Sequence, residues 1–219
     1  MNDLLHTATA VANEFLRRAR ESYTTLSATQ LHELVYCAHG WHLVLAGHPL
    51  ISGPIAAHKG GVYIPDLRIA GCWGGSPVQG LLHAVGDQHT FPRVDCGTPA
   101  FFTIDRVWTD YGPLSRYDLT RFTLSDNGPW HEVWSHAAES DSLLIPNRLL
   151  REWFGKVAAW RTAADHLLIE SYRTTQHETR PSAVVLARAV DARAAENDPI
   201  AADRLRMQEF RRNGLGAQH

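Results

Sequence analysis

Residues 26–45 read LSATQLHELVYCAHGWHLVL and carry the pattern of a helix. Ser27 suits the N-cap of a helix. The apolar residues after it recur at intervals of three and four, which would place them on one face of that helix. Gly47 and Pro49 end the pattern. We therefore expect a helix that begins after Ser27. Its inner face comprises Leu31, Leu34, Val35, Ala38, Trp41, His42 and Leu45.

Helical patterns also lie on both sides of this stretch. Residues 5–20 carry an amphipathic stripe from Leu5 to Ala19, which predicts a helix that packs against the first one. Residues 101–111 form another such stripe before Gly112, and Ser115 suits the cap of a short helix through Phe122. Residues 149–168 predict a long helix.

The segments between these helices are irregular. Residues 47–99 hold most of the glycine and proline, with β-prone pieces such as 61–64, so we expect turns, short strands or a hairpin there. Residues 127–130 read as a turn. Residues 174–182 are polar and read as a linker, and the Ala/Arg/Glu-rich residues after it read as helical.

These patterns predict a mainly α (α+β) fold. We expect a compact helical domain with a short β-hairpin or irregular insertion in its middle and a helical tail at its C-terminal end. The predicted domain covers residues 1–173, and the predicted linker and tail cover residues 174–219.

Composition limits the possible functions. The chain has 219 residues, of which 44% are hydrophobic and 20% charged, as in folded domains. A net charge of −2 provides no general attraction to nucleic acid or anionic membranes. Cys37, Cys72 and Cys96 form no C-x-x-C pair, which argues against a disulfide framework and a zinc ribbon. With no signal-peptide pattern and no long apolar run, we expect a cytoplasmic protein without membrane contact.

Two stretches carry a resemblance to a known family. Residues 11–16 (VANEFL), 26–41 and 47–50 (GHPL) are similar to the opening helix, the helix with a leucine-tyrosine-alanine-histidine-glycine-tryptophan pattern, and the glycine-x-proline-leucine turn of the Panacea domain of SocA-like antitoxins and GepA-like proteins. Residues 107–130 resemble the family's tyrosine-glycine, leucine-serine and proline-tryptophan motifs in the same order. The resemblance spans approximately residues 11–160.

The chain also departs from the family pattern at two places. Where the family has tryptophan, a basic residue, tyrosine, glycine and proline, residues 58–62 read HKGGV, so the departures fall on His58, Gly60 and Val62. Where the family has threonine-histidine, this chain has Thr123 followed by Leu124. Any function that requires the family's histidine or its aromatic pair is therefore in question.

The resemblance implies an antitoxin that neutralises a genetically linked toxin protein by direct contact. In some relatives the antitoxin also delivers the toxin to a ClpX-type protease. From the residues themselves we expect no cofactor, no metal and no catalytic residue. The oligomeric state stays open, with a dimer as one possibility.

Aromatic residues near loops and glycines that permit close approach predict the partner-binding surface. The predicted partner-binding residues are His58, Lys59, Gly60, Gly61, Tyr63, Trp73, Leu124, Asp126, Trp130 and Trp134. Trp41, Trp108, Trp153 and Trp160 are instead expected in the core, at helical spacing. The residues expected to carry structural motifs are Tyr36, His39, Gly40, Trp41, Tyr111, Gly112 and Pro129.

The sequence gives little support for a catalytic site or a metal site. His32, His39 and His42 share a helical face, but no fourth ligand can be named. Residues 71–76 lack the phosphate-loop patterns, and Cys37 lies in no recognisable catalytic motif. Two alternatives stay open: a hydrolase that uses Cys37 or the histidines, and a phage or mobile-element regulator that binds DNA through the arginines of residues 198–219.

Overall fold

The computed structural model describes residues 5–69, 76–137 and 142–175, with side chains described as far as residue 163. The contacts divide the chain into two units, Met1–Phe154 and Gly155–His219. Of the second unit, only the helical residues 155–175 are described. Trp73, Cys72 and the predicted tail beyond residue 175 lie outside the described residues, so the domain boundary at 173/174 stays a prediction.

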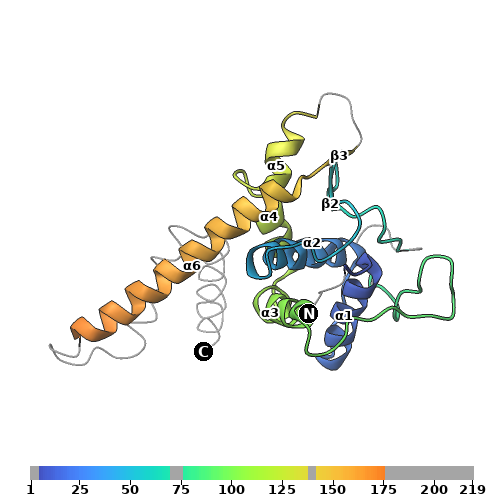
Figure 1. The fold of residues 1–219 in the computed structure, drawn as a ribbon, viewed down its shortest axis with the longest axis horizontal. Helices are drawn as coiled ribbons and strands as arrows, with labels where there is room; N and C mark the ends of the chain where they lie inside the picture. Colours follow the sequence, from blue (N-terminus) through green and yellow to red (C-terminus); the bar gives the residue numbers. More distant parts are fainter. Residues whose placement is uncertain (1–4, 70–75, 138–141, 176–219) are drawn as a thin grey trace, which may run out of the picture. The chain divides into compact units, whose positions relative to one another are not determined.

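The fold class predicted from the sequence is confirmed. The described residues form six α-helices and a three-stranded antiparallel sheet of order β2-β1-β3, an α+β arrangement (Figure 1). The helices are α1 (Ala8–Glu21), α2 (Ala28–Leu45), α3 (Pro99–Tyr111), α4 (Arg116–Thr123), α5 (Pro129–Trp134) and α6 (Asn147–Thr175). The strands are β1 (Ala56–His58), β2 (Gly61–Tyr63) and β3 (Ser142–Leu144).

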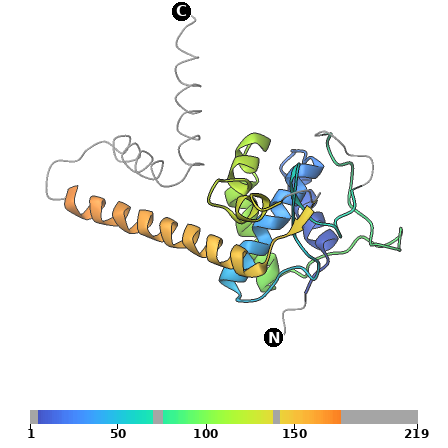
Figure 2. The same ribbon diagram turned by 90° about the horizontal axis from the view of Figure 1, so that it is seen from above.

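Helix α2 lies at the centre of the first unit. It contacts α1, α3, α4 and β2, and Figures 1 and 2 show it between these elements. From Glu33 to Leu43 every residue of α2 is buried. A helix that is apolar on all sides is stable only inside a protein, so the other elements are arranged to cover it.

Hydrogen-bonding caps define where the helices begin. Ser27 accepts a hydrogen bond from the backbone N–H of Gln30, and the Gln30 side chain bonds the Ser27 backbone N–H, a complete capping box. Thr7, Thr98 and Ser115 cap α1, α3 and α4 in the same way. The caps predicted at Ser27 and Ser115 are thus confirmed.

Gly40 permits a close approach between α2 and the start of α6. A Cβ atom built on Gly40 would lie 2.1 Å from ring carbons of Phe154, which lies in the first turns of α6. No real Cβ approaches that closely, so only glycine lets the Phe154 ring lie against the α2 backbone. The ring also packs against Tyr36 and Trp41, at centroid distances of 5.7 and 5.6 Å.

Three details of the sequence prediction are wrong. The turn expected at 127–130 ends at Gly128, because helix α5 begins at Pro129, which does not need to donate a hydrogen bond in the first turn of a helix. Trp160, expected in the core, is 49% exposed. Leu5 and Leu45, placed on the inner faces of their helices, are also exposed: Leu5 precedes the Thr7 cap, and Leu45 is the last residue of α2.

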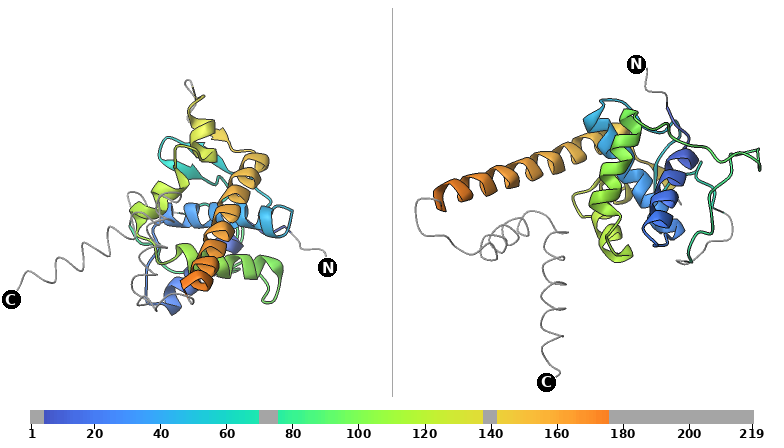
Figure 3. Two further views of the ribbon diagram at one scale, coloured as in Figure 1. Left: turned by 90° about the vertical axis from the view of Figure 1, so that its left-hand side faces the viewer. Right: turned by 90° about the horizontal axis from the view of Figure 1, so that it is seen from below.

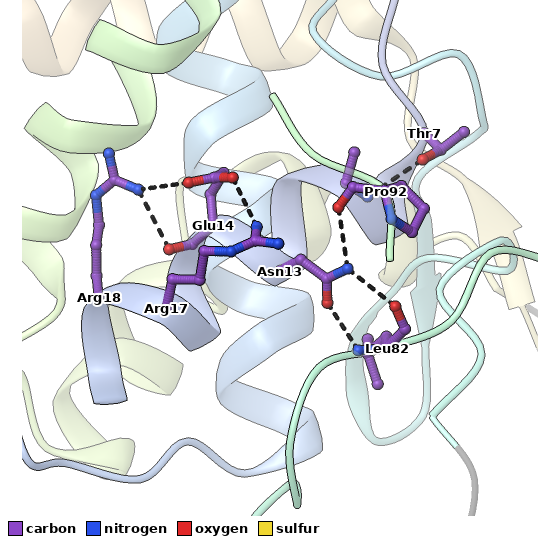
Figure 4. Close-up of polar contacts among 8 residues, drawn as sticks. Thr7, Asn13, Glu14, Arg17, Arg18, Leu82 and Pro92 are labelled. Carbon is purple, nitrogen blue, oxygen red and sulfur yellow. Dashed lines mark hydrogen bonds and ion pairs between the residues drawn. The ribbon is translucent and has the colours of Figure 1, made fainter. Parts of the chain in front are cut away.

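Asn13 anchors the loop that runs from residue 76 to residue 98. Its side-chain amide donates to the carbonyl oxygens of Leu82 and Pro92 at 2.9 and 3.1 Å, and its Oδ1 accepts from the N–H of Leu82 at 2.8 Å (Figure 4). Asn13 is fully buried. One side chain thus joins both ends of residues 83–91, which extend away from the helices in Figures 1 and 2.

Replacing Gly40 by alanine should destabilise the first unit. The new methyl group would overlap the Phe154 ring, and overpacking of this kind costs about 1–3 kcal/mol. Thermal and urea unfolding of Gly40→Ala measure the loss, and the double variant Gly40→Ala/Phe154→Leu should recover part of it. Gly60→Ala is the control, because a Cβ there meets only the His58 ring at an ordinary 3.6 Å. Equal stability of Gly40→Ala and the wild type would contradict the close approach.

Replacing Asn13 by alanine should release the loop without unfolding the helices. Three hydrogen bonds are lost, each worth about 1 kcal/mol, but the freed groups of Leu82 and Pro92 can turn to water. Amide hydrogen exchange should therefore quicken at Leu82 and across residues 83–91, with α2 unchanged. Thr109→Ala, which removes an exposed hydroxyl on α3, is the control. Unchanged exchange at Leu82 would refute the anchoring role.

Candidate functional site

The β1–β2 hairpin and helix α5 form one surface of the first unit. Figure 1 and the left view of Figure 3 both show α5 beside the small sheet, and α5 contacts β1 and β3. We call it the hairpin–α5 surface and define it by the residues His58, Lys59, Gly60, Gly61, Tyr63, Leu124, Trp130 and Trp134. All of them were predicted from the sequence as partner-binding residues.

The hairpin turn requires glycine. Lys59 and Gly60 connect His58 to Gly61, which are paired across the strands. Gly61 has a φ of 120°, a backbone conformation that other residues rarely adopt. His58, Lys59 and Gly60 are exposed, so the turn presents backbone groups and one basic side chain to solvent.

Aromatic side chains connect the hairpin to α5. The Trp130 indole N–H donates to the His58 carbonyl oxygen at 3.3 Å, and the Trp130 ring stacks on Trp134 with centroids 5.7 Å apart and an angle of 21°. The Tyr63 ring lies 5.9 Å from the His58 ring and 5.4 Å from the His32 ring. These side chains are therefore oriented by neighbours while part of each stays accessible.

The remaining predicted partner residues differ in their positions. Leu124 lies against the hairpin, because a Cβ on Gly61 would be 3.9 Å from its Cδ2 atom. Asp126 is exposed in the turn between α4 and α5. Trp73 lies outside the described residues. Of the four departures from the family pattern, His58, Gly60 and Leu124 lie on this surface, whereas Val62 is buried beneath it.

The predicted motif residues lie mainly in the core. Tyr36, His39, Trp41 and Tyr111 are at most 1% exposed, and the Trp41 indole N–H donates to the Tyr111 hydroxyl at 3.0 Å. This bond joins the two stretches that resemble the family. Gly112 lies against its own helix, since a Cβ there would approach the Trp108 carbonyl oxygen to 2.5 Å. Pro129 is buried at the start of α5.

His39 and His42 are used structurally. His39 Nδ1 accepts the N–H of Ile51 at 3.4 Å, so its Nε2 carries the proton and donates to Asn147 Oδ1 at 2.9 Å. Burial lowers the pKa of His39 to about 4, although the bond to Asn147 opposes this shift. His42 Nδ1 lies 2.9 Å from the Thr103 hydroxyl. The two rings connect α2 to α6 and to α3.

Glu33 is a buried acid that the sequence analysis did not single out. Its Oε1 accepts hydrogen bonds from the hydroxyls of Thr120 and Thr123 at 2.7 and 3.3 Å, and its Oε2 is buried without a hydrogen-bond partner in the described structure. Burial raises the pKa of Glu33 to about 7, against the two hydroxyl bonds and the charge of Arg116. The only sequence signal was a charged residue one position from the inner-face residue Leu34.

Of the candidate catalytic or metal-binding residues on α2, His32 is half-buried and accepts the N–H of Ile64 on its Nδ1 at 3.2 Å, whereas the other three are buried. Cys37 has no solvent exposure, and His39 and His42 are each 1% exposed. Within the described ranges, no three histidine, cysteine or acidic side chains are grouped so that they could hold a metal ion. No helix in the part of the chain that the structure describes is long and apolar enough to span a membrane.

Comparison of the chain with protein-family models, with curated proteins and with solved structures finds no match.

The buried carboxyl predicts a specific pH dependence. Because the folded pKa of Glu33 is about 7 and its ordinary value is 4.5, the folded state keeps its proton between these values. The stabilisation of the folded state by this proton is fully present below pH 4.5 and is lost as the pH rises through 7. The free energy of unfolding changes by about 3 kcal/mol over this range. Glu33→Gln, which stays neutral, should therefore be more stable than the wild type at pH 8, and the difference should shrink toward pH 5.

Urea unfolding at pH 5, 6, 7 and 8 measures this difference. The buried histidines, whose pKa values of about 4 reduce stability as the pH falls below 6.5, act equally in both proteins and cancel. Glu132→Gln, an exposed change of the same kind, should follow the wild type at every pH. A difference between wild type and Glu33→Gln that does not vary with pH would mean that Glu33 is ionised in the fold.

Proposed function

We propose that this chain is an antitoxin-type protein that binds a toxin protein through the hairpin–α5 surface and blocks the toxin's active surface by covering it. The observation that carries the proposal is the convergence of His58, Tyr63, Leu124, Trp130 and Trp134. These residues come from a hairpin, the end of α4 and a short helix, and they meet on one face. No chemical step is required.

The character of this surface is typical of protein recognition. Tyrosine and tryptophan dominate interface hot spots because they offer a large contact area for little loss of side-chain freedom. Tyr63 is 40% exposed, and both tryptophans are partly exposed. Since the hydrogen bond to His58 and the ring stack already hold Trp130, little order has to be gained on binding.

The pattern of matches and departures supports the same proposal. Most residues that match the family motifs, such as Tyr36, Trp41 and Tyr111, build the core, and Trp130 of the proline-tryptophan motif lies on the hairpin–α5 surface. Three of the four departures are on the hairpin–α5 surface. A shared core with a divergent surface is expected when related antitoxins bind different toxins. The proposal includes delivery of the toxin to a ClpX-type protease, and it assigns no residue to that step.

The two alternatives lack an observation in their favour. A hydrolase based on Cys37, His39 or His42 would require the substrate to reach side chains that are at most 1% exposed. A DNA-binding role would rest on the arginines of residues 198–219, which lie outside the described residues.

Changes on the surface should weaken toxin binding and leave the fold intact. We expect the tagged chain to co-purify with the product of the neighbouring gene and to restore growth of cells that express it. Trp130→Ala and Tyr63→Ala should each weaken the complex by about 30-fold, the loss typical of a hot spot. Isothermal titration calorimetry with the purified pair measures this.

Phe102→Ala is the matched control, because Phe102 is an aromatic residue on α3 with 62% exposure and is not part of the surface. It should bind as the wild type does. A harmless neighbouring gene product that forms no complex would refute the antitoxin proposal. A complex that tolerates both Trp130→Ala and Tyr63→Ala would refute the hairpin–α5 surface as its site.

A further inference from the structure

Among the residues that the structure describes, the small sheet has one edge covered by helices and one edge with no further strand beside it. Strand β2 packs against α2 and α4, and beyond its end the N–H of Ile64 donates to His32 Nδ1 at 3.2 Å. Strand β3, at the other edge, pairs with β1 alone among the described strands. An open edge presents backbone donors and acceptors that can pair with another strand.

The register of β3 determines which groups face outward. Leu143 lies opposite Ala57, and the N–H of Ile145 donates to the Ile55 carbonyl oxygen at 2.8 Å. In an antiparallel ladder, residues that exchange hydrogen bonds alternate with residues that do not. Leu143 and Ile145 therefore bond toward β1, and the backbone groups of Ser142 and Leu144 face away from it.

The open edge ends at Leu144. The next outward position is Pro146, which has no N–H, and its carbonyl oxygen lies 3.0 and 3.4 Å from the N–H groups of Leu149 and Leu150 in α6. Ser142 and Leu144 are both exposed, Leu144 by 64% of its surface. The edge thus offers two donors and two acceptors, arranged symmetrically about Leu143.

We infer that β3 pairs with β3 of a second copy of this chain, antiparallel, across a two-fold axis at Leu143. In this register, Ser142 lies opposite Leu144 of the partner subunit, and Leu144 lies opposite Ser142 of the partner subunit. The two pairs use the outward N–H and C=O groups of Ser142 and Leu144 in each copy. Pro146, which has no N–H, prevents the pairing from extending or shifting beyond Leu144. The two three-stranded sheets join into one continuous sheet.

A second copy fits this edge better than an unrelated strand. The outward groups of Ser142 and Leu144 lie symmetrically about Leu143, so the same edge of a second, antiparallel copy is complementary to them. A closed two-fold interface requires this self-complementarity. The short pairing and the exposed leucine provide a small contact, so the dimer should form in a concentration-dependent way. The inference does not rest on the proposed antitoxin function, because self-association is measured with the purified chain alone.

Paired charge variants test the register. Ser142→Lys/Leu144→Lys and Ser142→Glu/Leu144→Glu each place like charges opposite one another at both pairs, which disfavours pairing. By sedimentation velocity over a concentration series, the wild type should shift from monomer to dimer. Each variant alone should dimerise at least about tenfold more weakly, and an equimolar mixture of the two should recover a dimer. Gln79→Lys/Gln88→Lys, on an exposed loop, should behave as the wild type.

A second measurement needs no variant. In the wild type, amide hydrogen exchange at Ser142 and Leu144 should slow as the protein concentration rises, while Leu143, already bonded to β1, should change little. A wild type that stays monomeric over the whole series overturns the inference. So does a dimer that both charge variants retain, or exchange at Ser142 and Leu144 that does not depend on concentration.

Discussion

The contact between Gly40 and Phe154 is the constraint on which the first unit depends. It lets an aromatic ring lie directly against the backbone of the central helix, and the same ring packs against Tyr36 and Trp41. Trp41 in turn holds Tyr111 at the end of α3. Phe122 of α4 lies 6.1 Å from Phe154 between ring centroids. Four helices therefore meet around one position without a side chain.

The sequence predicted the helices well because their signals are local. Ser27 and Ser115 indicate helix caps, and apolar residues at intervals of three and four indicate the buried faces of helices. It missed α5 and β3 because six-residue and three-residue elements are too short for periodicity to be read. The candidate surface was predicted as a set of residue types near loops. That Trp130 bonds to His58 could not be predicted, because their contact joins residues 72 positions apart.

Two buried polar residues, His39 and Glu33, hold elements together, and burial favours the neutral form of each. His39 connects α2, the segment at Ile51 and α6, while Glu33 connects α2 and α4 through two threonine hydroxyls. Burial lowers the pKa of His39 and raises that of Glu33, and each shift favours the uncharged form. Shifts of this kind often mark catalytic sites, but here they accompany residues that solvent does not reach.

The bond from Trp130 to the hairpin has an evolutionary consequence. Its acceptor is a backbone carbonyl oxygen, which every amino acid provides, so the identity of the side chain at position 58 is irrelevant to the attachment of α5. The lineage can therefore substitute this exposed position, and with it the chemistry offered to a partner, without losing the connection that orients the tryptophan. The side chain at position 58 and the attachment of α5 are thus independent of one another, as the proposed binding of a divergent partner would require.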